Sequence, residues 1–583
     1  MDFKRVIVLL LLAAFGCRQQ DSIISPTYTE APATDPARVA LAQEWNKVEA
    51  PTLSNFQTAN TSWLYFAGAN ETLTTFSFPD WDNAELLDLP HRVTLPNSPM
   101  WYQWKVTNDI DSVVMLVNAD DGAQAFLNRK KLKRVAGDRF YLKADAGDTL
   151  VIRVLNNAMA GGLRSVRLVP LADYRTFQNQ STLYHKAAAL LQQVQRLNNP
   201  SAEVMEAANQ LAENIADENA VKLNALLSAY PMLSGPVLLN NEGHFEINWL
   251  STASGEATIL SGESPDQLAS EFTVTAQQQP FRFPLEQLSE ASFYRIRQLD
   301  TWTEIFEVPR VTDSSNPESF SFTLWADSQG GWNTFSQLMA QTKDDDDKFS
   351  LGAGDLVANG SDSLQWKSLL TSLGQAKGRF PFYLVPGNHD YDGYYDDLNP
   401  KNFNQYITTP SGKNYFSWQY GNCAFIAIDP NEAFPIGFDS GGQKEWFLNE
   451  IETAEWKAAT WHFVVLHQPP VSQGWPGYHG DEAVRQLLDT VYESAGIDFV
   501  VAGHTHDYER LTRNYGDQKV NFLIVGGAGG GLEPEGEMSE EPVMDVVVKR
   551  HHLARMFVQG DSIHLEVKDP DQNIIDQFDF KKQ

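Results

Sequence analysis

The sequence predicts a multidomain protein in which all-β sandwich domains and a helical linker precede a C-terminal α/β domain. A chain of 583 residues is too long for one hydrophobic core, since single cores stop growing at about 250–300 residues. The apolar periodicity changes along the chain, from the alternation of strands to helical spacing and finally to short, nearly all-apolar runs. These changes set the predicted domain boundaries.

The first segment, residues 1–17, has the pattern of a lipoprotein signal peptide. Lys4 and Arg5 precede an apolar stretch that is too short to span a bilayer and fits a signal-peptide core. The stretch ends in Gly16-Cys17, which resembles a bacterial lipobox, although Ala14 stands where that motif usually has leucine. The resemblance implies lipidation of Cys17 and a lipid-anchored protein of the bacterial cell envelope, at the outer membrane, the cell surface or the periplasm. Ordinary secretion with cleavage elsewhere is the alternative.

The formal net charge of −31 limits the partners that the protein can attract. This excess of negative charge repels nucleic acid and anionic membrane surfaces. We therefore expect no nucleic-acid binding, and contact with the membrane only through the lipid anchor. Phosphate binding would need a local source of positive charge, such as a bound metal. Cys423, the one other cysteine, lies in an apolar run and is predicted to be a small core residue.

Residues 18–55 are predicted to be a tether and residues 56–171 a β-sandwich or jelly roll. The tether is rich in Thr, Pro and Ala. In the next segment, turn clusters separate short alternating runs such as Ser112–Val117 and Thr149–Val154, a spacing typical of all-β sandwiches. The stretch from Asp120 to Asn128 resembles galactose-binding-like jelly-roll modules. This resemblance implies a carbohydrate-binding module, and a purely structural accessory domain remains the alternative.

Residues 172–232 are predicted to be a helical linker, because apolar residues such as Leu190 and Val194 recur there at helical spacing. Alternation returns in residues 233–312. One of the predicted strands of this segment contains Trp249, and the unit resembles a fibronectin type III-like domain.

The last segment, residues 318–583, contains five short apolar runs, each of which ends in a side chain that can bind a metal. Such runs, closed by a polar or glycine turn, predict buried strands. Ligands gather beyond the carboxyl ends of strands in open α/β sheets, so we expect these side chains to meet at one edge. They are Asp327, Asp355, Asn388, His467 and His504, and His506 follows two residues after the last. Two aspartates, an asparagine and three histidines predict a two-metal site, which favours a hydrolase.

The residue types of this set fit the chemistry of a metal pair. Divalent metals bridged by a carboxylate are held by oxygen donors and imidazoles. Asp355 could bridge with both of its oxygens, and Gly354 would let the backbone turn sharply before it. Asn388 offers a neutral amide oxygen, which avoids the repulsion that another carboxylate would exert on phosphate. His504 and His506 would point the same way, as alternate residues of an extended segment do.

The motifs and their order resemble the calcineurin-like metallophosphoesterases over about residues 319–583. The matching motifs are Asp327, Gly354-Asp355, Gly387-Asn388-His389-Asp390, His467 and Gly503-His504-Thr505-His506. Further motifs resemble the purple acid phosphatase branch, namely Gly441-Gly442-Gln443, Tyr508-Glu509-Arg510 and Gly526-Gly527-Ala528-Gly529-Gly530. In that branch a fibronectin-like domain also stands just upstream. The resemblance implies a double β-sheet sandwich flanked by helices, with the metals at one edge.

The same resemblance implies two divalent or mixed-valence metal ions, with Mn, Zn, Fe and Mg as candidates. Metal one would be held by Asp327, Asp355 and His506, and metal two by Asp355, Asn388, His467 and His504. Two departures concern metal one. Gln329 stands where most relatives have histidine, and Ala358 stands where purple acid phosphatases have their iron-binding tyrosine. We therefore expect no tyrosinate–iron chromophore. Gln329 could bind a metal through its amide oxygen, or the first site could be weakened or empty.

The activity that the resemblance implies is hydrolysis of phosphate mono- or diesters by attack of a metal-bound hydroxide, as in acid phosphatases and phosphodiesterases. The substrate would be a phosphorylated small molecule or glycan. His389 would orient phosphate and protonate the leaving group, or else only orient a ligand. Asp390 would support His389. His479 resembles a substrate-loop histidine, with an exposed loop residue as the alternative.

A different class of function remains open beside the enzyme. The protein could be a surface carbohydrate-binding or assembly lipoprotein whose phosphoesterase domain has decayed. Gln329 and Ala358 favour this alternative, whereas the complete set of other ligands favours the enzyme.

Overall fold

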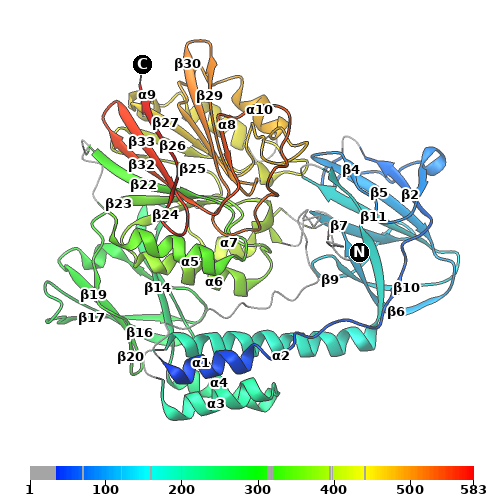
Figure 1. Cartoon of the computed structure of the whole chain (residues 1–583), viewed down its shortest axis with the longest axis horizontal. Helices are drawn as coiled ribbons and strands as arrows, with labels where there is room; N and C mark the ends of the chain where they lie inside the picture. The colour runs from blue at the N-terminus through cyan, green and yellow to red at the C-terminus, as the bar shows by residue number, and fades with distance from the viewer. Residues whose placement is uncertain are drawn as a thin grey trace, which may run out of the picture.

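The computed structural model describes residues 35–582, except 69–70, 120, 158–159, 198–199, 312–316, 318, 393–395, 397 and 439–441. The predicted signal peptide with Cys17, and residues 18–34 of the predicted tether, lie outside the described residues. Figure 1 shows a β-rich body at the N-terminal side, a larger C-terminal body, and the long helix α2 running below the latter. None of the described helices has the length and apolar character needed to cross a membrane.

The N-terminal β-rich body consists of two sheets packed on each other, in the residues predicted to be a sandwich. The first sheet has the order β1-β13-β6-β10-β9 and the second β3-β2-β5-β11-β7-β8, and β4 pairs with β12. The strands are β1 (Gln57–Thr58), β2 (Trp63–Ala67), β3 (Glu85–Leu87), β4 (Val93–Thr94), β5 (Ser98–Lys105), β6 (Ile110–Asn118), β7 (Gly122–Leu127), β8 (Lys130–Lys131), β9 (Arg134–Ala136), β10 (Arg139–Ala144), β11 (Thr149–Asn156), β12 (Ala160–Gly161) and β13 (Ser165–Pro170). Apolar side chains of both sheets, including Trp63, Met115 and Ile152, form a common core.

Four helices form a separate bundle, one in the residues predicted to be a tether and the others in or next to the predicted helical linker. They are α1 (Pro36–Trp45), α2 (Leu171–Arg196), α3 (Ala202–Glu213) and α4 (Asp217–Ala229). Trp45 of α1 packs on Tyr184 of α2, and leucines of all four helices share their core. The side chain of Ser201 accepts a hydrogen bond from the N–H of Val204 and so caps α3.

Residues 233–312 contribute to two sheets, a five-stranded sheet of their own and part of a larger one. Their strands are β14 (Leu233–Asn241), β15 (His244–Ser251), β16 (Gly255–Gly262), β17 (Ser270–Ala276), β18 (Phe281–Pro284), β19 (Phe293–Gln298), β20 (Thr301–Trp302) and β21 (Phe306–Glu307). β14, β15 and β18 join a nine-stranded sheet of the C-terminal body, because Leu238 and Leu239 pair in parallel with Pro381 and Phe382. The predicted boundary near residue 312 is therefore not a break in the hydrogen-bonded framework. Alternation along a strand indicates its buried face but not its neighbour.

The C-terminal body is built on two stacked sheets. One has the order β18-β15-β14-β24-β23-β22-β32-β33-β34 and the other β25-β26-β27-β28-β30-β29-β31. The strands not yet given are β22 (Ser319–Trp325), β23 (Asp347–Ala353), β24 (Pro381–Val385), β25 (Phe416–Tyr420), β26 (Cys423–Ala427), β27 (Trp461–Val465), β28 (Phe499–Ala502), β29 (Tyr508–Tyr515), β30 (Gln518–Val525), β31 (Val546–Val548), β32 (Leu553–Gln559), β33 (Ser562–Lys568) and β34 (Ile574–Lys581).

The core of this body lies between the two sheets. Phe322 of the first sheet stacks on Phe349 with ring centroids 4.7 Å apart, and its edge meets Phe463 of the second sheet at 5.7 Å. Cys423 is buried in the same core, as predicted, and the helices cover the outer faces. Helices α5 (Trp332–Gln341), α6 (Ser363–Leu373) and α7 (Lys401–Tyr406) cover the nine-stranded sheet, and α8 (Gln443–Glu450), α9 (Ala454–Ala458) and α10 (Glu482–Leu488) the other.

The N-terminal sandwich docks on loops of the C-terminal body. The N–H of Leu73 donates to the carbonyl of Phe434 at 3.1 Å. The side chain of Asn97 donates to the carbonyl of Ile436 at 3.1 Å and accepts the N–H of the same residue. The guanidinium of Arg134 pairs with Asp396, which also pairs with Lys131 at 2.9 Å. These contacts fix the sandwich to two loops, the one that follows β26 and the one that contains Asp396.

Removal of Arg134 should loosen this docking. Its guanidinium is only 12% exposed and also lies 3.2 Å from the buried carboxylate of Asp138, so Arg134→Ala leaves Asp138 without its cation and Asp396 with Lys131 alone. We expect a loss of roughly 3 kcal/mol in the free energy of unfolding, the lower end of the range for breaking a buried ion pair, because Asp396 keeps some solvent contact. Thermal denaturation measures this loss. Lys130→Ala, on an exposed strand of the same sandwich, is the control and should leave the midpoint unchanged.

Candidate metal centre

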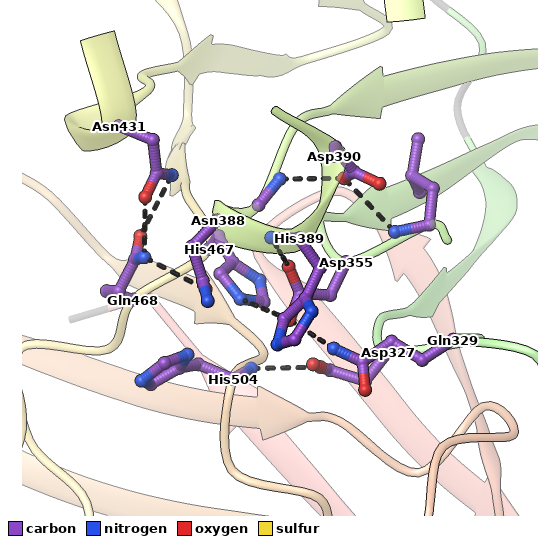
Figure 2. Close-up of polar contacts among 12 residues, drawn as sticks. Asp327, Gln329, Asp355, Asn388, His389, Asp390, Asn431, His467, Gln468 and His504 are labelled. Carbon is purple, nitrogen blue, oxygen red and sulfur yellow. Dashed lines mark hydrogen bonds and ion pairs between the residues drawn. The ribbon is translucent and has the colours of Figure 1, made fainter. Parts of the chain in front are cut away.

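The predicted strand-end side chains come together at one edge of the stacked sheets. β22, β23 and β24 run parallel in the first sheet, and β27 and β28 run parallel in the second. Their carboxyl ends therefore open on the same side, where ligands collect in α/β folds. Figure 2 shows Asp327, Asp355, Asn388, His467 and His504 facing one another there. Strands of both sheets contribute to this edge, a division that the residue pattern alone does not predict.

The backbone turns abruptly at the residues that carry the ligands. Asp327, Asp355 and His504 have φ angles of 61°, 49° and 73°, in the left-handed region that side chains other than glycine rarely adopt. Such strain persists where the surrounding structure enforces it, and it clusters at functional sites. Gly387 allows the closest approach, since a β-carbon there would lie 2.2 Å from Oδ1 of Asp355.

Three of these side chains form a compact set of metal donors. The ligand atoms of Asp355, His467 and His504 lie within 4.8 Å of one another, and all three residues are buried. Nδ1 of His467 bonds to the carbonyl oxygen of Ala353 at 2.9 Å, which directs Nε2 toward Asp355 Oδ2 at 3.2 Å. Nε2 of His467 and Nε2 of His504 are buried and have no hydrogen-bond partner among the described residues. Buried polar atoms without partners are costly, and a cation would satisfy both.

Asn388 is held by a chain of amides and carboxylates. Gln468 Nε2 donates to Asn388 Oδ1 at 3.3 Å and to Asn431 Oδ1 at 2.8 Å. Asn431 in turn donates to Asp429 Oδ1 from its backbone at 2.9 Å and from its side chain at 3.1 Å. Figure 2 shows the part of this chain from Asn388 to Asn431. An amide oxygen has two lone pairs, so Asn388 Oδ1 keeps one for a metal.

The side of the predicted first metal is arranged differently. Asp327 Oδ2 accepts the N–H of His504 at 2.9 Å, while Oδ1 lies 3.5 Å from Nε2 of His506 and has no hydrogen bond within the described part of the chain. His506 Nδ1 bonds to the carbonyl oxygen of Gly531 at 2.5 Å, which leaves Nε2 facing the site. The amide nitrogen of Gln329 donates to Asp355 Oδ2, so its amide oxygen is not the atom nearest that carboxylate.

Burial and mutual charge shift the pKa values of the cluster in opposite directions. Burial is the largest influence on Asp355, but His467 and its neighbours outweigh it and hold the pKa of this carboxyl below its usual value. Burial would lower the pKa of His467, yet the charge of Asp355 raises it to about 9. Burial and the nearby His467 lower the pKa of His504 well below its usual value. The carboxylate of Asp355 and the imidazole of His467 therefore favour each other's charged forms.

These observations fit a bound divalent metal at Asp355, Asn388, His467 and His504. The donors are oxygens and imidazoles, the types that such ions take. Asp327 and His506 add an oxygen without a hydrogen bond from the described residues and an imidazole on the adjacent side. The fit there is less complete, because Ala358 has no donor side chain and Gln329 is turned to Asp355 through its nitrogen.

The three predicted catalytic side chains differ in their placement. His389 is half-buried beside the ligands, where its backbone N–H donates to Asp355 Oδ1 at 2.9 Å and its Nδ1 bonds to the carbonyl of Ala358 at 3.1 Å. Asp390 does not support the His389 ring as predicted. Its buried carboxylate instead accepts the backbone N–H groups of Leu356, Val357 and Gly387, at 3.1, 3.0 and 2.8 Å. It therefore fixes the loop after Asp355.

His479 is exposed, which favours the alternative of a loop residue over a role in the substrate loop. Its Nδ1 bonds to the carbonyl oxygen of Glu541, and the described residues show no contact between it and a predicted ligand. The neighbouring Tyr478 and Trp475 instead pack on His504, with ring centroids at 5.5 and 5.7 Å. Neither aromatic residue was predicted from the sequence, and their place in the loop after His467 was the only available signal.

Comparisons with known proteins place the similarity in this C-terminal body. Residues 320–508 match the family model described as Calcineurin-like phosphoesterase. Purple acid phosphatase 23 of Arabidopsis thaliana is 25% identical over 164 residues, which are 27% of this chain and 35% of that protein. The plant protein named "Probable inactive purple acid phosphatase 24" is 24% identical over 243 residues, or 35% of this chain and 38% of that one. The chain thus spans less than half the length of these curated relatives.

Solved structures show similarity at low sequence identity. The purple acid phosphatase PPD1 from yellow lupin seeds has a TM-score of 0.47 and 12% identity, and the alignment covers 83% of this chain and 92% of that one. PhoD has a TM-score of 0.45 and 10% identity, with 60% and 90% covered. The match at residues 320–508 and the plant relatives make this region similar to calcineurin-like metallophosphoesterases, with purple acid phosphatases among its homologues.

His467→Ala should remove most of the metal affinity of the protein. The change deletes a buried imidazole whose Nε2 faces Asp355 and has no hydrogen-bond partner among the described residues. We expect the protein to lose at least half of its bound metal after dialysis against a fixed free concentration, as measured by elemental analysis. His462→Gln, in the strand that precedes His467, is the matched control, because Nε2 of His462 bonds to the carbonyl oxygen of Trp456. Equal metal contents in the two variants would contradict the assignment.

Asp429→Asn should change how stability depends on pH. Burial, together with the charge of Glu432, raises the pKa of Asp429 to about 7. The folded protein then holds a proton that the unfolded chain releases, so this group's contribution is lost as the pH rises from about 4 to about 7. Over that range the lost free energy of unfolding amounts to roughly 1.4 kcal/mol for each step of one in pH. The midpoint of thermal denaturation of the variant should therefore rise relative to that of the wild type as the pH rises. A constant difference between the two midpoints would contradict the prediction.

Proposed function

We propose that the C-terminal body hydrolyses phosphate esters with the help of metal ions bound at Asp355, Asn388, His467 and His504. The observation that carries the proposal is the buried triad of Asp355, His467 and His504, in which two imidazole nitrogens have no partner among the described residues. The match of residues 320–508 to calcineurin-like phosphoesterases supports the same reaction. The negative net charge of the chain adds weight to a metal as the source of positive charge for phosphate.

The residues around the site would act in distinct ways. When bound, the metals would supply a Lewis acid for the phosphoryl oxygens and lower the pKa of a water molecule. Asn388 would present a neutral oxygen and so add no repulsion toward phosphate. His389 would supply a proton to the departing oxygen, because its Nδ1 is taken by the carbonyl of Ala358 and its Nε2 remains for the substrate. Asp390 would keep the loop of Asp355 in place.

We propose two metal sites that differ in strength. The stronger one has Asp355, His467 and His504, and the weaker one has Asp327 and His506 with Asp355 shared. Manganese, zinc, iron and magnesium all remain candidates for both. A tyrosinate–iron chromophore is not proposed, because residue 358 is alanine.

We further propose that the enzyme works at the bacterial cell envelope, attached through a lipid on Cys17. This proposal rests on the apolar stretch and Gly16-Cys17 at the N-terminus of the sequence. Metabolic labelling with a fatty acid, compared between the wild type and Cys17→Ser, would test it.

The alternative is a binding lipoprotein with a decayed phosphoesterase domain, and the inactive name of one plant relative favours it. Metal-free protein reloaded with manganese, zinc or iron should hydrolyse p-nitrophenyl phosphate or its bis-ester if the proposal holds. The ratio of the two rates would separate a monoesterase from a diesterase. No turnover with any of these metals would leave the decayed domain as the better account.

His389→Ala should slow the reaction most for substrates with poor leaving groups. Proton transfer by a positioned side chain contributes about 10²- to 10⁴-fold, so we expect a loss of that order in kcat for an alkyl phosphate such as glycerol phosphate. The loss for p-nitrophenyl phosphate should be much smaller, because p-nitrophenolate departs without a proton. His479→Ala is the control, since its side chain is exposed and bonded to a distant carbonyl. An equal loss for both substrates would show that His389 does not act as the acid.

A further inference from the structure

A cavity lies beside the candidate metal centre, between helix α2 and the C-terminal body. Its volume is about 750 Å³. Residues of α2 form one wall, residues of α6 form the opposite wall, and the end of β15 with the following turn forms the floor. In Figure 1, α2 runs below α5 and α6 without joining their layer. None of the predicted metal ligands lines this cavity.

The wall formed by α2 presents a regular stripe of side chains. On α2, Phe177, Ser181, His185 and Gln192 recur at spacings of four, four and seven residues, which places them on one face of the helix. The apolar face of α2 is used elsewhere, because residues such as Leu191 pack against α1, α3 and α4. The stripe on α2 is therefore not needed for the packing of the bundle.

The chemistry of the lining is neutral and polar. More than half of the residues that line the cavity carry an amide or a hydroxyl group, and only Arg139, Asp362 and Lys367 are charged. The side chains of Gln192 and Gln193 have no hydrogen-bond partner among the described residues. The partly exposed Trp332 adds aromatic surface, whereas Phe177 packs in a buried cluster with Tyr174. Amides and hydroxyls for hydrogen bonds, combined with an aromatic ring for C–H faces, suit a sugar chain better than an ion or a hydrocarbon.

One end of the cavity lies next to the loops that surround the metal centre. Gly330 and Asn359 line it, and they directly follow Gln329 and Ala358. The carbonyl oxygen of Ala358 bonds to the ring of His389. A chain that lies in the cavity could therefore extend an attached phosphate toward the metal ligands.

From this geometry we propose that the cavity is a binding cleft for a neutral oligosaccharide, whose phosphorylated end would reach the metal centre. The binding of the sugar chain is inferred from the cavity alone, whereas the placement of its phosphorylated end depends on the proposed function. A polyanion such as a nucleic acid is disfavoured, because the cleft offers two cations against one anion and the chain carries a charge of −31. A neutral peptide is the main competing occupant, and the experiment must separate it from a sugar.

Binding is tested first, without any hydrolysis. Maltohexaose, mannohexaose and chitohexaose are added to full-length protein without added metal, and binding is followed by saturation-transfer NMR. We expect at least one hexasaccharide to bind at millimolar concentration. Ser368→Trp, which places a large ring in the α6 wall, should weaken that binding at least tenfold. Gln178→Ala is the matched control on α2, because Gln178 is exposed and lies outside the cleft.

The competing results each overturn the proposal. Absence of binding by all three hexasaccharides excludes a sugar cleft. Binding that Ser368→Trp leaves intact places the sugar elsewhere, for example on the N-terminal sandwich. Binding of a neutral polar decapeptide that Ser368→Trp abolishes, with no effect of the hexasaccharides, assigns the cleft to peptides.

The link to the metal centre needs a separate measurement. The KM of wild type for maltohexaose 6-phosphate should be at least tenfold below that for glucose 6-phosphate, and Ser368→Trp should remove this advantage. Equal KM values in the wild type overturn the link between cleft and centre. If no phosphate ester is hydrolysed while a hexasaccharide still binds in the cleft, the proposed function fails and the sugar cleft stands.

Discussion

The carboxylate of Asp355 lies in the protein interior, where an ionised group is stable only if its surroundings supply compensating charge and hydrogen bonds. His467 supplies the charge at 3.2 Å, the N–H of His389 supplies one hydrogen bond, and Gln329 supplies another. The loops that hold these partners are then constrained to approach within van der Waals contact, which explains why residue 387 is glycine. The arrangement of the whole edge follows from the need to stabilise this one charge.

The support of the site extends well beyond the C-terminal sheets. Phe434 and Ile436, which bond to the N-terminal sandwich, follow closely after Asp429 and Asn431. Asn431 bonds to Gln468, and Gln468 bonds to the predicted ligand Asn388. The sandwich therefore rests on the same loop that orients a ligand. Hydrogen bonds and the short chain segment from Asn431 to Phe434 thus connect the accessory domain to the side chains that support the centre.

The local sequence pattern predicted the strands and the edge at which the ligands meet, but it did not predict which strands pair with each other. The apolar runs that end before Asp327 and Asp355 are strands, and the ligands do meet at their carboxyl ends. The union of β14 with β24 could not be predicted, because alternation does not reveal which strand lies alongside. The contacts of Asp390 and the exposure of His479 depend on how distant loops fold back. Trp475 and Tyr478 are found only through their packing on His504, which has no periodic signature.

The two halves of the metal centre differ in how far the protein has prepared them. Around His467 and His504 two buried nitrogens lack a partner among the described residues, and Nε2 of His467 lies 3.2 Å from Oδ2 of Asp355. On the other half, Oδ2 of Asp355 is occupied by the amide nitrogen of Gln329. For that amide to offer its oxygen to a cation, its hydrogen bond to Asp355 must break and the group must rotate. Histidine at this position would need no such exchange. In the proposed two-metal centre, Gln329 would therefore favour binding of the first cation at His467 and His504.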